Sequence, residues 1–365
     1  MNDRARGSAA ADLVAALVRP EIRALSAYAV AKAEGMIKLD AMENPYALPE
    51  ALRARLGAAL ARVPINRYPD GAADDARAAL RRAFALPEAA GVLLGNGSDE
   101  LIQIITATLA RPGAAMLAPE PSFVMYRTNA LYSGMRYVGV SLRPDFSLDV
   151  TAMLETIERE RPALVYLAYP NNPTGNLFAA SDVETLLRAA PGLVVVDEAY
   201  HAFAQTSFLP RLADFGNLLV LRTVSKVGMA GLRLGYAVAA PEWIAEFNKV
   251  RQPYNVNALT QAAIVELTAD CSWIEEQAGA IRAERERVGA ALGRLPATTV
   301  YPTHANFIVV RVADAARVFE GLKARRILAK NLHGWHPLLD GCLRITVGTP
   351  AQNDLLLAAC AELCR

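Results

Sequence analysis

Short apolar runs recur through the middle of the chain, and helical patterns separate them. Each run has three to seven residues, as expected for strands that are buried on both faces. Strands that alternate with helices build a parallel sheet with helices on both sides. The pattern therefore predicts an α/β fold, with strands near residues 92–94, 115–118, 136–142, 164–168, 193–196, 218–221 and 234–239.

The last third of the chain has a different pattern. Residues 241–269 predict one helix, and residues 306–311 and 343–347 predict strands on either side of a helix at 315–324. These segments indicate a smaller α+β unit. A chain of 365 residues exceeds the usual size of one core, so we expect two subdomains.

Composition excludes several classes of function. A hydrophobic content of 53% and a net charge of +1 indicate a globular enzyme and no nucleic-acid partner. Asp12 interrupts the alanine-rich N-terminal stretch, and no long uncharged run follows, so we expect a cytoplasmic protein without a membrane partner. The four cysteines form no CxxC pair and His333 and His336 no HExxH pattern, so we predict no metal.

Lys226 follows one of the apolar runs. A lysine amine becomes a nucleophile toward carbonyl groups when burial or a nearby cation lowers its pKa. Thr223 and Ser225 precede it and Arg233 follows, so two hydroxyls and a guanidinium could hold a phosphate beside the amine. A surface loop can contain the same residue types, so the segment alone leaves both interpretations open.

Two further apolar runs also end in polar residues. Residues 193–196 lead to Asp197, whose carboxylate could face a ring nitrogen. Residues 164–168 lead into a proline and glycine turn that carries Asn171 and Asn172. Three such strand ends predict one site. An amine beside a phosphate-binding group is what pyridoxal phosphate requires.

The segment Gly91–Glu100 precedes an apolar helix and contains Gly97, Ser98 and Asp99. A helix N-terminus binds phosphate through its unpaired amides and the positive end of its dipole. An ordinary capped helix has the same pattern, because Gly-x-Gly before a helix is a weak signal. Both interpretations stay open on this segment.

Seven motifs follow one another along nearly the whole chain: Asp40–Tyr46, Asn66–Asp70, Gly95–Glu100, Asn171–Gly175, Asp197–Tyr200, Ser225–Lys226 and Cys342–Gly348. In these motifs the chain resembles the fold-type I pyridoxal phosphate aminotransferases, and within them the histidinol-phosphate aminotransferases. Asn-Pro-Thr-Gly, Asp-x-x-Tyr and Ser-Lys mark the superfamily, whereas Arg-Tyr-Pro and Leu-Arg-Ile-Thr-Val-Gly-Thr point to the narrower family. The resemblance implies a large domain with a mostly parallel mixed sheet and a smaller α+β domain.

The resemblance also implies roles for residues around the cofactor. Lys226 would form the Schiff base, and Asp197 would keep the ring nitrogen protonated. Asn172 and Tyr200 would hydrogen-bond the ring's 3-oxygen, and Phe123 would stack on the ring, although an aromatic residue in such a stretch is as often simply core. The phosphate-binding set would contain Ser98, Asp99, Thr223, Ser225 and Arg233, with Asp99 contributing mainly backbone or structural contacts.

Further residues are implied at the subunit interface and the substrate. Tyr68 would reach the cofactor phosphate of a neighbouring subunit, so the resemblance implies a homodimer. Arg344 would bind the anionic group of each substrate, because a guanidinium can hold a carboxylate or a phosphate bidentately. Tyr28, Asn44 and Lys330 would assist it. For Lys330 a solvated lysine is an equally good interpretation.

The domain division expected from the resemblance has three parts. Residues 1–63 form an N-terminal segment and part of the small domain, and roughly residues 11–63 pack with the C-terminal unit. Residues 64–255 form the large cofactor-binding domain. Residues 256–365 form an interdomain helix and the C-terminal small domain.

The implied reaction is ping-pong transamination of L-histidinol phosphate with 2-oxoglutarate, which yields imidazole acetol phosphate and glutamate in histidine biosynthesis. Three alternatives stay open. An aromatic or broad-specificity aminotransferase would use the same catalytic residues. A threonine-phosphate decarboxylase would release carbon dioxide. A non-catalytic cofactor-binding module of a regulator is disfavoured, because the chain shows no DNA-binding segment.

Overall fold

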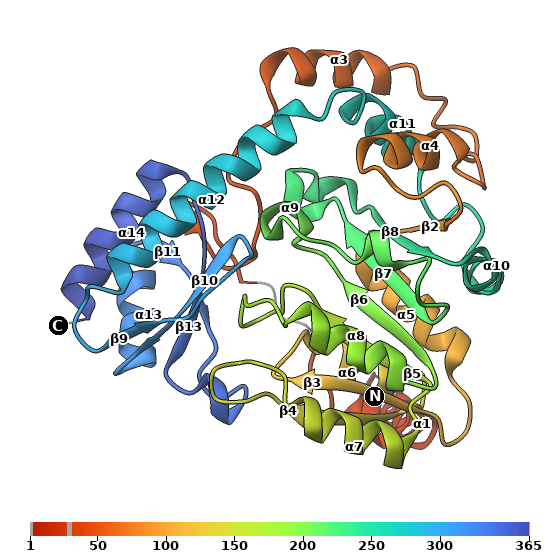
Figure 1. The fold of residues 1–365 in the computed structure, drawn as a ribbon, viewed down its shortest axis with the longest axis horizontal. Coiled ribbons are helices and arrows are strands. Elements are labelled where there is room, and N and C mark those ends of the chain that lie inside the picture. Colours follow the sequence, from red (N-terminus) through yellow and green to blue (C-terminus); the bar gives the residue numbers. More distant parts are fainter. Residues whose placement is uncertain (1–2, 28–30, 365) are drawn as a thin grey trace.

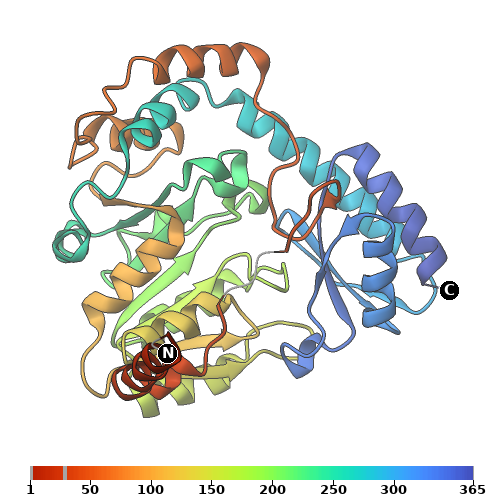
Figure 2. The same cartoon turned by 180° about the vertical axis from the view of Figure 1, so that it is seen from behind.

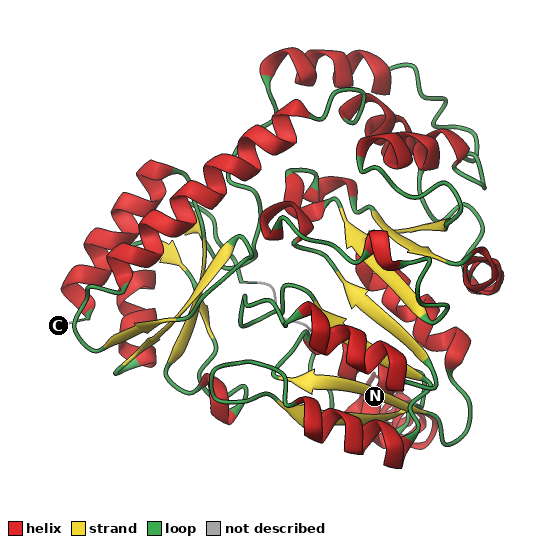
Figure 3. Cartoon of the chain, viewed as in Figure 1, coloured by secondary structure: helices red, strands yellow, loops and turns green. Residues whose placement is uncertain are grey.

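The computed structural model describes residues 3–27 and 31–364. Within them the chain builds a seven-stranded and a four-stranded β-sheet, here called the large and the small sheet, each flanked by helices, and a third sheet of two short strands (Figure 1). Figure 3 shows that helices surround the strands of both sheets. The α/β fold predicted from the alternating apolar runs is confirmed.

The large sheet is mixed but mostly parallel. Five neighbouring strands, β7, β6, β5, β3 and β4, run parallel. Strand β8 is antiparallel to both of its neighbours, β2 and β7. Every predicted strand is present, with bounds within one or two residues of those expected. In spatial order the strands are β2 (Gly91–Gly95), β8 (Gly235–Ala239), β7 (Leu218–Thr223), β6 (Leu193–Asp197), β5 (Leu164–Ala168), β3 (Ala115–Glu120) and β4 (Arg136–Ser141).

Helices cover both faces of this sheet, which explains why its central strands are apolar throughout. The faces can be followed in Figures 1 and 2, which show the molecule from opposite sides. One face packs against α5 (Gly97–Leu109), α6 (Val124–Tyr132) and α10 (Pro241–Val250). The other packs against α4 (Asp74–Ala83), α7 (Val150–Glu160), α8 (Ala180–Ala189) and the short α9 (His201–Ala204).

The small sheet is antiparallel and lies in the C-terminal third, so the predicted α+β unit is also confirmed. Helices α12 and α13 pack on it, and α14 packs on both helices. In order the strands are β12 (Lys330–Asn331), β13 (Cys342–Thr346), β10 (Phe307–Val312) and β9 (Thr298–Val300); the helices are α12 (Ser272–Leu292), α13 (Ala315–Ala324) and α14 (Pro350–Leu363).

Local capping explains where several helices begin. The side chain of Asp149 accepts a hydrogen bond from the backbone N–H of Ala152 at the start of α7. Thr349 and Gln352 form a reciprocal capping box at the start of α14. Such side chains satisfy amides that have no partner within the helix, so they favour a helix start at these positions.

The expectation of one helix over residues 241–269 is wrong. Helix α10 ends at Val250, and α11 (Ala258–Leu267) begins after a loop. Pro253 lies in this loop; it has no N–H to donate and disfavours helical geometry in the residue before it. Asn257 then starts α11, because its side chain accepts a hydrogen bond from the N–H of Thr260 at 2.9 Å.

The N-terminal segment is spread over both units. Strand β1 (Ile37–Lys38) pairs in parallel with β11 (Ile327–Leu328), beside the small sheet. Helix α2 (Pro20–Arg23), which follows α1 (Asp3–Leu17), packs instead against α6, and α3 (Glu50–Leu60) packs against α11.

The expectation that residues 11–63 pack as a whole with the C-terminal unit is therefore wrong for α2. Arg19 explains its place, since its guanidinium donates hydrogen bonds to the carbonyls of Leu131 and Tyr132 at the end of α6. The three-part domain division itself stays a prediction.

Gly235 tests how tightly the large sheet packs against the start of α5. A Cβ atom at this position would lie 2.5 Å from backbone atoms of Gly97 and Ser98. We predict that Gly235→Ala lowers the free energy of unfolding by about 1–3 kcal/mol, because backbone atoms have to move. Gly216→Ala is the matched control: its Cβ would meet nothing within 4 Å, so we expect a change below about 0.5 kcal/mol in urea unfolding. Equal effects of the two substitutions would contradict this prediction.

Candidate active site

A cavity of about 250 Å³ lies at the carboxyl ends of β5, β6 and β7. This is the edge at which open α/β sheets commonly bind ligands. The cavity brings together ten residues that were singled out in the sequence: Ser98, Asp99, Phe123, Asn172, Asp197, Tyr200, Thr223, Ser225, Lys226 and Arg233.

Lys226 lies in a single turn, Ser225–Val227, directly after β7. Its Nζ donates a hydrogen bond to the carbonyl of Ala41 at 3.2 Å and lies 5.9 Å from the centre of the Tyr200 ring. Burial, aided by the positive charge of Arg344, lowers the pKa of the Lys226 amine to about 8. A substantial fraction of the amine is therefore neutral slightly above neutral pH, as a nucleophile requires.

Asp197 ends β6 and is almost fully buried, with 4% of its surface exposed. Its Oδ2 accepts a hydrogen bond from the hydroxyl of Tyr126 at 2.8 Å, and its Oδ1 accepts one from the N–H of Ala199 at 3.1 Å. Burial raises the pKa of Asp197 to about 6, although these two hydrogen bonds oppose the rise. The carboxylate is thus mostly ionised at neutral pH and suited to face a cationic ring nitrogen.

The sequence analysis did not single out Tyr126, and its contact with Asp197 was missed. The ring of Tyr126 stacks on Tyr166 at 4.4 Å between centroids, and Phe123 meets it edge-on at 5.6 Å. Phe123 itself lines the cavity. A tyrosine in an apolar helix usually indicates core, so only the contact across 71 residues identifies its partner.

Asn172 connects the cavity to the small sheet. Its Oδ1 accepts a hydrogen bond from Arg344 Nη1 at 2.6 Å, and Arg344 Nη2 donates to the carbonyl of Asp40 at 3.0 Å. A guanidinium only donates, so the amide of Asn172 must present its oxygen to Arg344. The amide nitrogen is then the atom of Asn172 that can donate to a ligand oxygen. Arg344 is buried on β13, behind the lining residues.

Hydroxyl groups and a guanidinium gather at the N-terminus of α5. Thr223 Oγ1 lies 2.9 Å from Ser225 Oγ, which also accepts a hydrogen bond from Arg233 Nη1 at 3.3 Å. Asp99 faces Arg233 at 3.8 Å, and Ser98 occupies the first turn of α5 beside it. Amides, hydroxyls and a guanidinium at one helix end can hold a phosphate.

Gly97 makes this approach possible. Its φ angle is +78°, and a Cβ atom would lie 2.8 Å from the guanidinium of Arg233. A larger residue would therefore separate Arg233 from the N-terminus of α5.

One wall of the cavity was missed. Ala41, Met42 and Glu43 line it, although the sequence singled out only Asn44 from this motif. Asn306 Nδ2 donates to the carbonyl of Met42 at 2.9 Å and holds the segment in place. Asn44 is not among the lining residues. Its Nδ2 donates a hydrogen bond to Gln277 Oε1 at 2.9 Å.

Two other expected residues, Tyr68 and Lys330, lie outside the cavity lining. Tyr68 is 82% exposed and stacks on Tyr254 at 4.7 Å. Lys330 on β12 is the backbone strand partner of Arg344 on the adjacent strand β13. The amine of Lys330 lies 5.1 Å from the Trp335 ring centre. Tyr28 lies outside the described residues. The roles assigned to all of these site residues stay predictions.

The described ranges contain no cluster of three or more histidine, cysteine, aspartate or glutamate side chains that could hold a metal ion. Nor do they contain a helix long and apolar enough to cross a membrane.

We predict that the amine of Lys226 titrates far below an ordinary lysine in cofactor-free protein. Labelling with an amine-acylating reagent from pH 6 to 11, read by mass spectrometry, should give a midpoint at about 8. Arg344→Gln should move the midpoint upward, because a cation that disfavours the ammonium form is lost. Exposed Lys249 serves as the reference for reagent reactivity in each sample. A midpoint above 10 would contradict the prediction.

Comparisons with known proteins identify the family of the chain. Residues 34–359 match the model of the family "Aminotransferase class I and II". The chain is 58% identical to a histidinol-phosphate aminotransferase of Chromobacterium violaceum over 94% of this chain and 96% of the relative. It is 54% identical to histidinol-phosphate aminotransferase 1 of Ralstonia nicotianae over 96% of this chain and 95% of the relative.

A solved structure shares the fold. Histidinol-phosphate aminotransferase from Sinorhizobium meliloti, in complex with pyridoxal-5'-phosphate, superposes with a TM-score of 0.85 at 26% identity, over 96% of this chain and 98% of that one. With the family model and the relatives at more than half identity, this likeness leads to one conclusion. The chain belongs to the aminotransferase class I and II family, a family of pyridoxal phosphate enzymes, and within it to the histidinol-phosphate aminotransferases.

Proposed function

We propose that the chain transfers the amino group of L-histidinol phosphate to 2-oxoglutarate, forming imidazole acetol phosphate and glutamate in histidine biosynthesis. The observation that carries the proposal is the single cavity that unites Lys226, Asp197 and the hydroxyl and guanidinium groups at the start of α5. Relatives at 54% and 58% identity that bear this activity in their names support the choice of substrate.

The residues of the cavity fit pyridoxal phosphate. The low pKa of Lys226 suits an amine that reacts with an aldehyde, and buried Asp197 suits a protonated ring nitrogen. Ser98, Ser225 and Arg233 suit the phosphate. When bound, the cofactor supplies a carbonyl group that condenses with amines and a ring that accepts the electrons of the substrate's Cα–H bond.

Each residue then has a defined task. The free amine of Lys226 would take the proton from the α-carbon of the substrate and carry it toward C4′ of the bound cofactor. Asp197 stays anionic and holds a proton on the ring nitrogen. Asn172 and Tyr200 donate to the 3-oxygen, and Phe123 supports the face of the ring.

Arg344 is the proposed receptor for the anionic group of both substrates, the phosphate of histidinol phosphate and the carboxylate of glutamate. Its guanidinium donates a hydrogen bond to Asn172, and Asn172 lines the cavity. A guanidinium suits both anions because it offers paired N–H donors in one plane. Tyr28, Asn44 and Lys330 are proposed to assist.

The proposal includes a homodimer in which Tyr68 reaches the cofactor phosphate of the partner. The exposure of Tyr68 supports this arrangement, since most of its surface is free to contact a partner subunit. Stacking on Tyr254 holds its ring in place. A cytoplasmic location and the three-part domain division belong to the same proposal.

The first experiment mixes cofactor-loaded protein with L-histidinol phosphate and follows the visible absorption of the bound cofactor. We expect bleaching by this substrate and recovery on addition of 2-oxoglutarate. Phenylalanine, tyrosine and threonine phosphate are compared under the same conditions. Bleaching mainly by the aromatic amino acids, or release of carbon dioxide from threonine phosphate, would replace the proposed substrate.

Lys226→Ala tests the proposed proton transfer. We expect multiple-turnover transamination to fall by at least about 10⁴-fold, because both the nucleophile and the proton carrier are lost. Cofactor binding should persist through the phosphate-binding groups, as equilibrium dialysis can measure. Lys249→Ala is the control, since this lysine is exposed and pairs with Glu246 on α10, outside the cavity. Normal turnover by the Lys226 variant would refute the assignment.

A further inference from the structure

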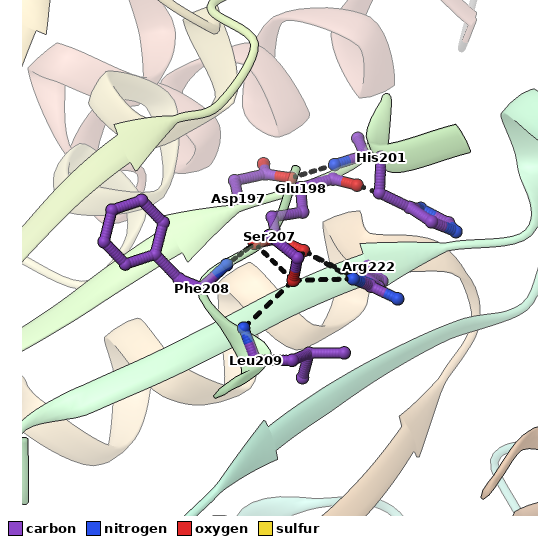
Figure 4. Close-up of polar contacts among 8 residues, drawn as sticks. Asp197, Glu198, His201, Ser207, Phe208, Leu209 and Arg222 are labelled. Atoms are coloured by element: carbon purple, nitrogen blue, oxygen red, sulfur yellow. Dashed lines mark hydrogen bonds and ion pairs between the residues drawn. The ribbon is translucent and has the colours of Figure 1, made fainter. Parts of the chain in front are cut away.

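A buried ion pair lies directly behind Asp197 (Figure 4). Glu198, the next residue in the chain, is fully buried, and Arg222 is 5% exposed. Neither residue lines the cavity, and the proposed reaction assigns neither of them a task. Two buried charges are costly unless they are well paired, so their position beside Asp197 calls for an explanation.

Strand geometry places the pair on the far side of the sheet from the Asp197 carboxylate. Val195 and Val196 pack into different core clusters, because successive side chains of a strand point to opposite faces. Asp197 continues the face of Val195, and Glu198 continues the face of Val196. The parallel register of β6 and β7 brings Arg222 beside Glu198.

The hydrogen bonds of Glu198 leave neither carboxylate oxygen without a donor. Arg222 Nε and Nη2 donate to Oε2 at 2.9 and 2.7 Å. The N–H of Phe208 donates to Oε1 at 2.5 Å, and the hydroxyl of Ser207 lies 2.8 Å from Oε2 (Figure 4). Ser207 Oγ in turn accepts from Arg222 Nη2 at 2.8 Å and from the N–H of Leu209 at 2.9 Å. These donors offset part of the free-energy cost of burying the carboxylate of Glu198.

Titratable groups face Asp197 from every element packed around it. Tyr126 comes from α6, Tyr166 from β5, Tyr200 follows β6, and Asp99 lies on α5. Burial raises the pKa values of Tyr126 and Tyr166, so these two tyrosines are neutral at working pH.

The two neighbouring carboxylates oppose the charge of Asp197. Glu198 and Asp99 each disfavour a further negative charge at this position. Arg222 faces Glu198, as Arg233 faces Asp99. Burial and the charge of Arg222 also hold the pKa of nearby His201 well below its usual range, so His201 adds no cation to the pair.

We propose that Arg222 and Glu198 are positioning residues that set the proton affinity of Asp197. Arg222 offsets part of the negative charge that Glu198 places beside Asp197, and the hydrogen-bonded pair holds the end of β6 in place. Asp197 therefore remains an anion facing the ring nitrogen of the cofactor. The inference rests on the proposed role of Asp197, but not on the identity of the substrate.

Glu198→Gln is the decisive variant. Glutamine keeps the shape and the acceptor for Phe208, whereas Arg222 keeps its charge because a guanidinium does not deprotonate in proteins. The uncompensated cation should lower the proton affinity at the ring nitrogen. In resting protein loaded with ¹⁵N-labelled pyridoxal phosphate, NMR titration from pH 6 to 11 should show the ring proton released about one pH unit earlier than in wild type.

Three further variants separate charge from packing. Glu198→Gln with Arg222→Gln removes both charges and should restore the midpoint to within a few tenths of a pH unit. Arg222→Lys keeps the charge but loses the paired N–H donors, so it should leave the midpoint unchanged. Glu184→Gln is the matched control, because Glu184 on α8 pairs with Arg188 and Arg211 outside the cavity; it should not shift the midpoint.

The outcomes that overturn the inference are distinct. An unchanged midpoint in Glu198→Gln would overturn it, as would equal shifts in the single and double variants, since those would reflect packing. If Glu198→Gln does not fold, Arg222→Gln alone replaces it: loss of the cation leaves the charge of Glu198 uncompensated, so the midpoint should rise by about one unit, and an unchanged midpoint would overturn the inference. Asp197→Asn tests the proposed role of Asp197 by itself. If this variant leaves the ring-nitrogen signal unchanged, the role of Asp197 is wrong, and the inference that rests on it is wrong as well.

Discussion

The structure depends on the parallel pairing of β5, β6 and β7, three strands buried on both faces. Parallel strands end at the same edge, so the polar residues that follow them converge although they are far apart in the chain. Asn172, Asp197 and Lys226 meet in one cavity for this reason. Helices on both faces keep water from the strands, and the same burial shifts the pKa values of Asp197 and Lys226 toward neutrality.

Burying these groups has a cost that their surroundings offset. Asp197 receives hydrogen bonds from Tyr126 and Ala199, and Asn172 receives one from Arg344. Each donor satisfies an oxygen that would otherwise lose its hydrogen bonds with water. These donors also fix the orientation of the side chains, which a cofactor with an amine-reactive carbonyl, a basic ring nitrogen and a phosphate requires. Fold stability and site geometry therefore depend on the same contacts.

The small sheet contributes to the cavity from a distance. Arg344 reaches Asn172 from β13, and Asn306 holds the carbonyl of Met42, whose segment forms one wall. Helix α12 extends from beside α9 of the large unit to the small sheet, so it connects the two units (Figure 1). A substrate anion bound at Arg344 would thus contact the small sheet while its amine reacts beside the large one.

The sequence alone determined the strands of the large sheet, two strands of the small sheet and most of the cavity residues, because an apolar run and the polar residue that ends it are adjacent in the chain. Its expectation failed where the helical pattern of residues 241–269 concealed a break at Pro253, and where α2 packs against α6. Tertiary structure alone decided the contact of Tyr126 with Asp197, the wall of residues 41–43 and the pairing of Glu198 with Arg222. These depend on strand register and on packing between distant segments, which a local pattern does not contain.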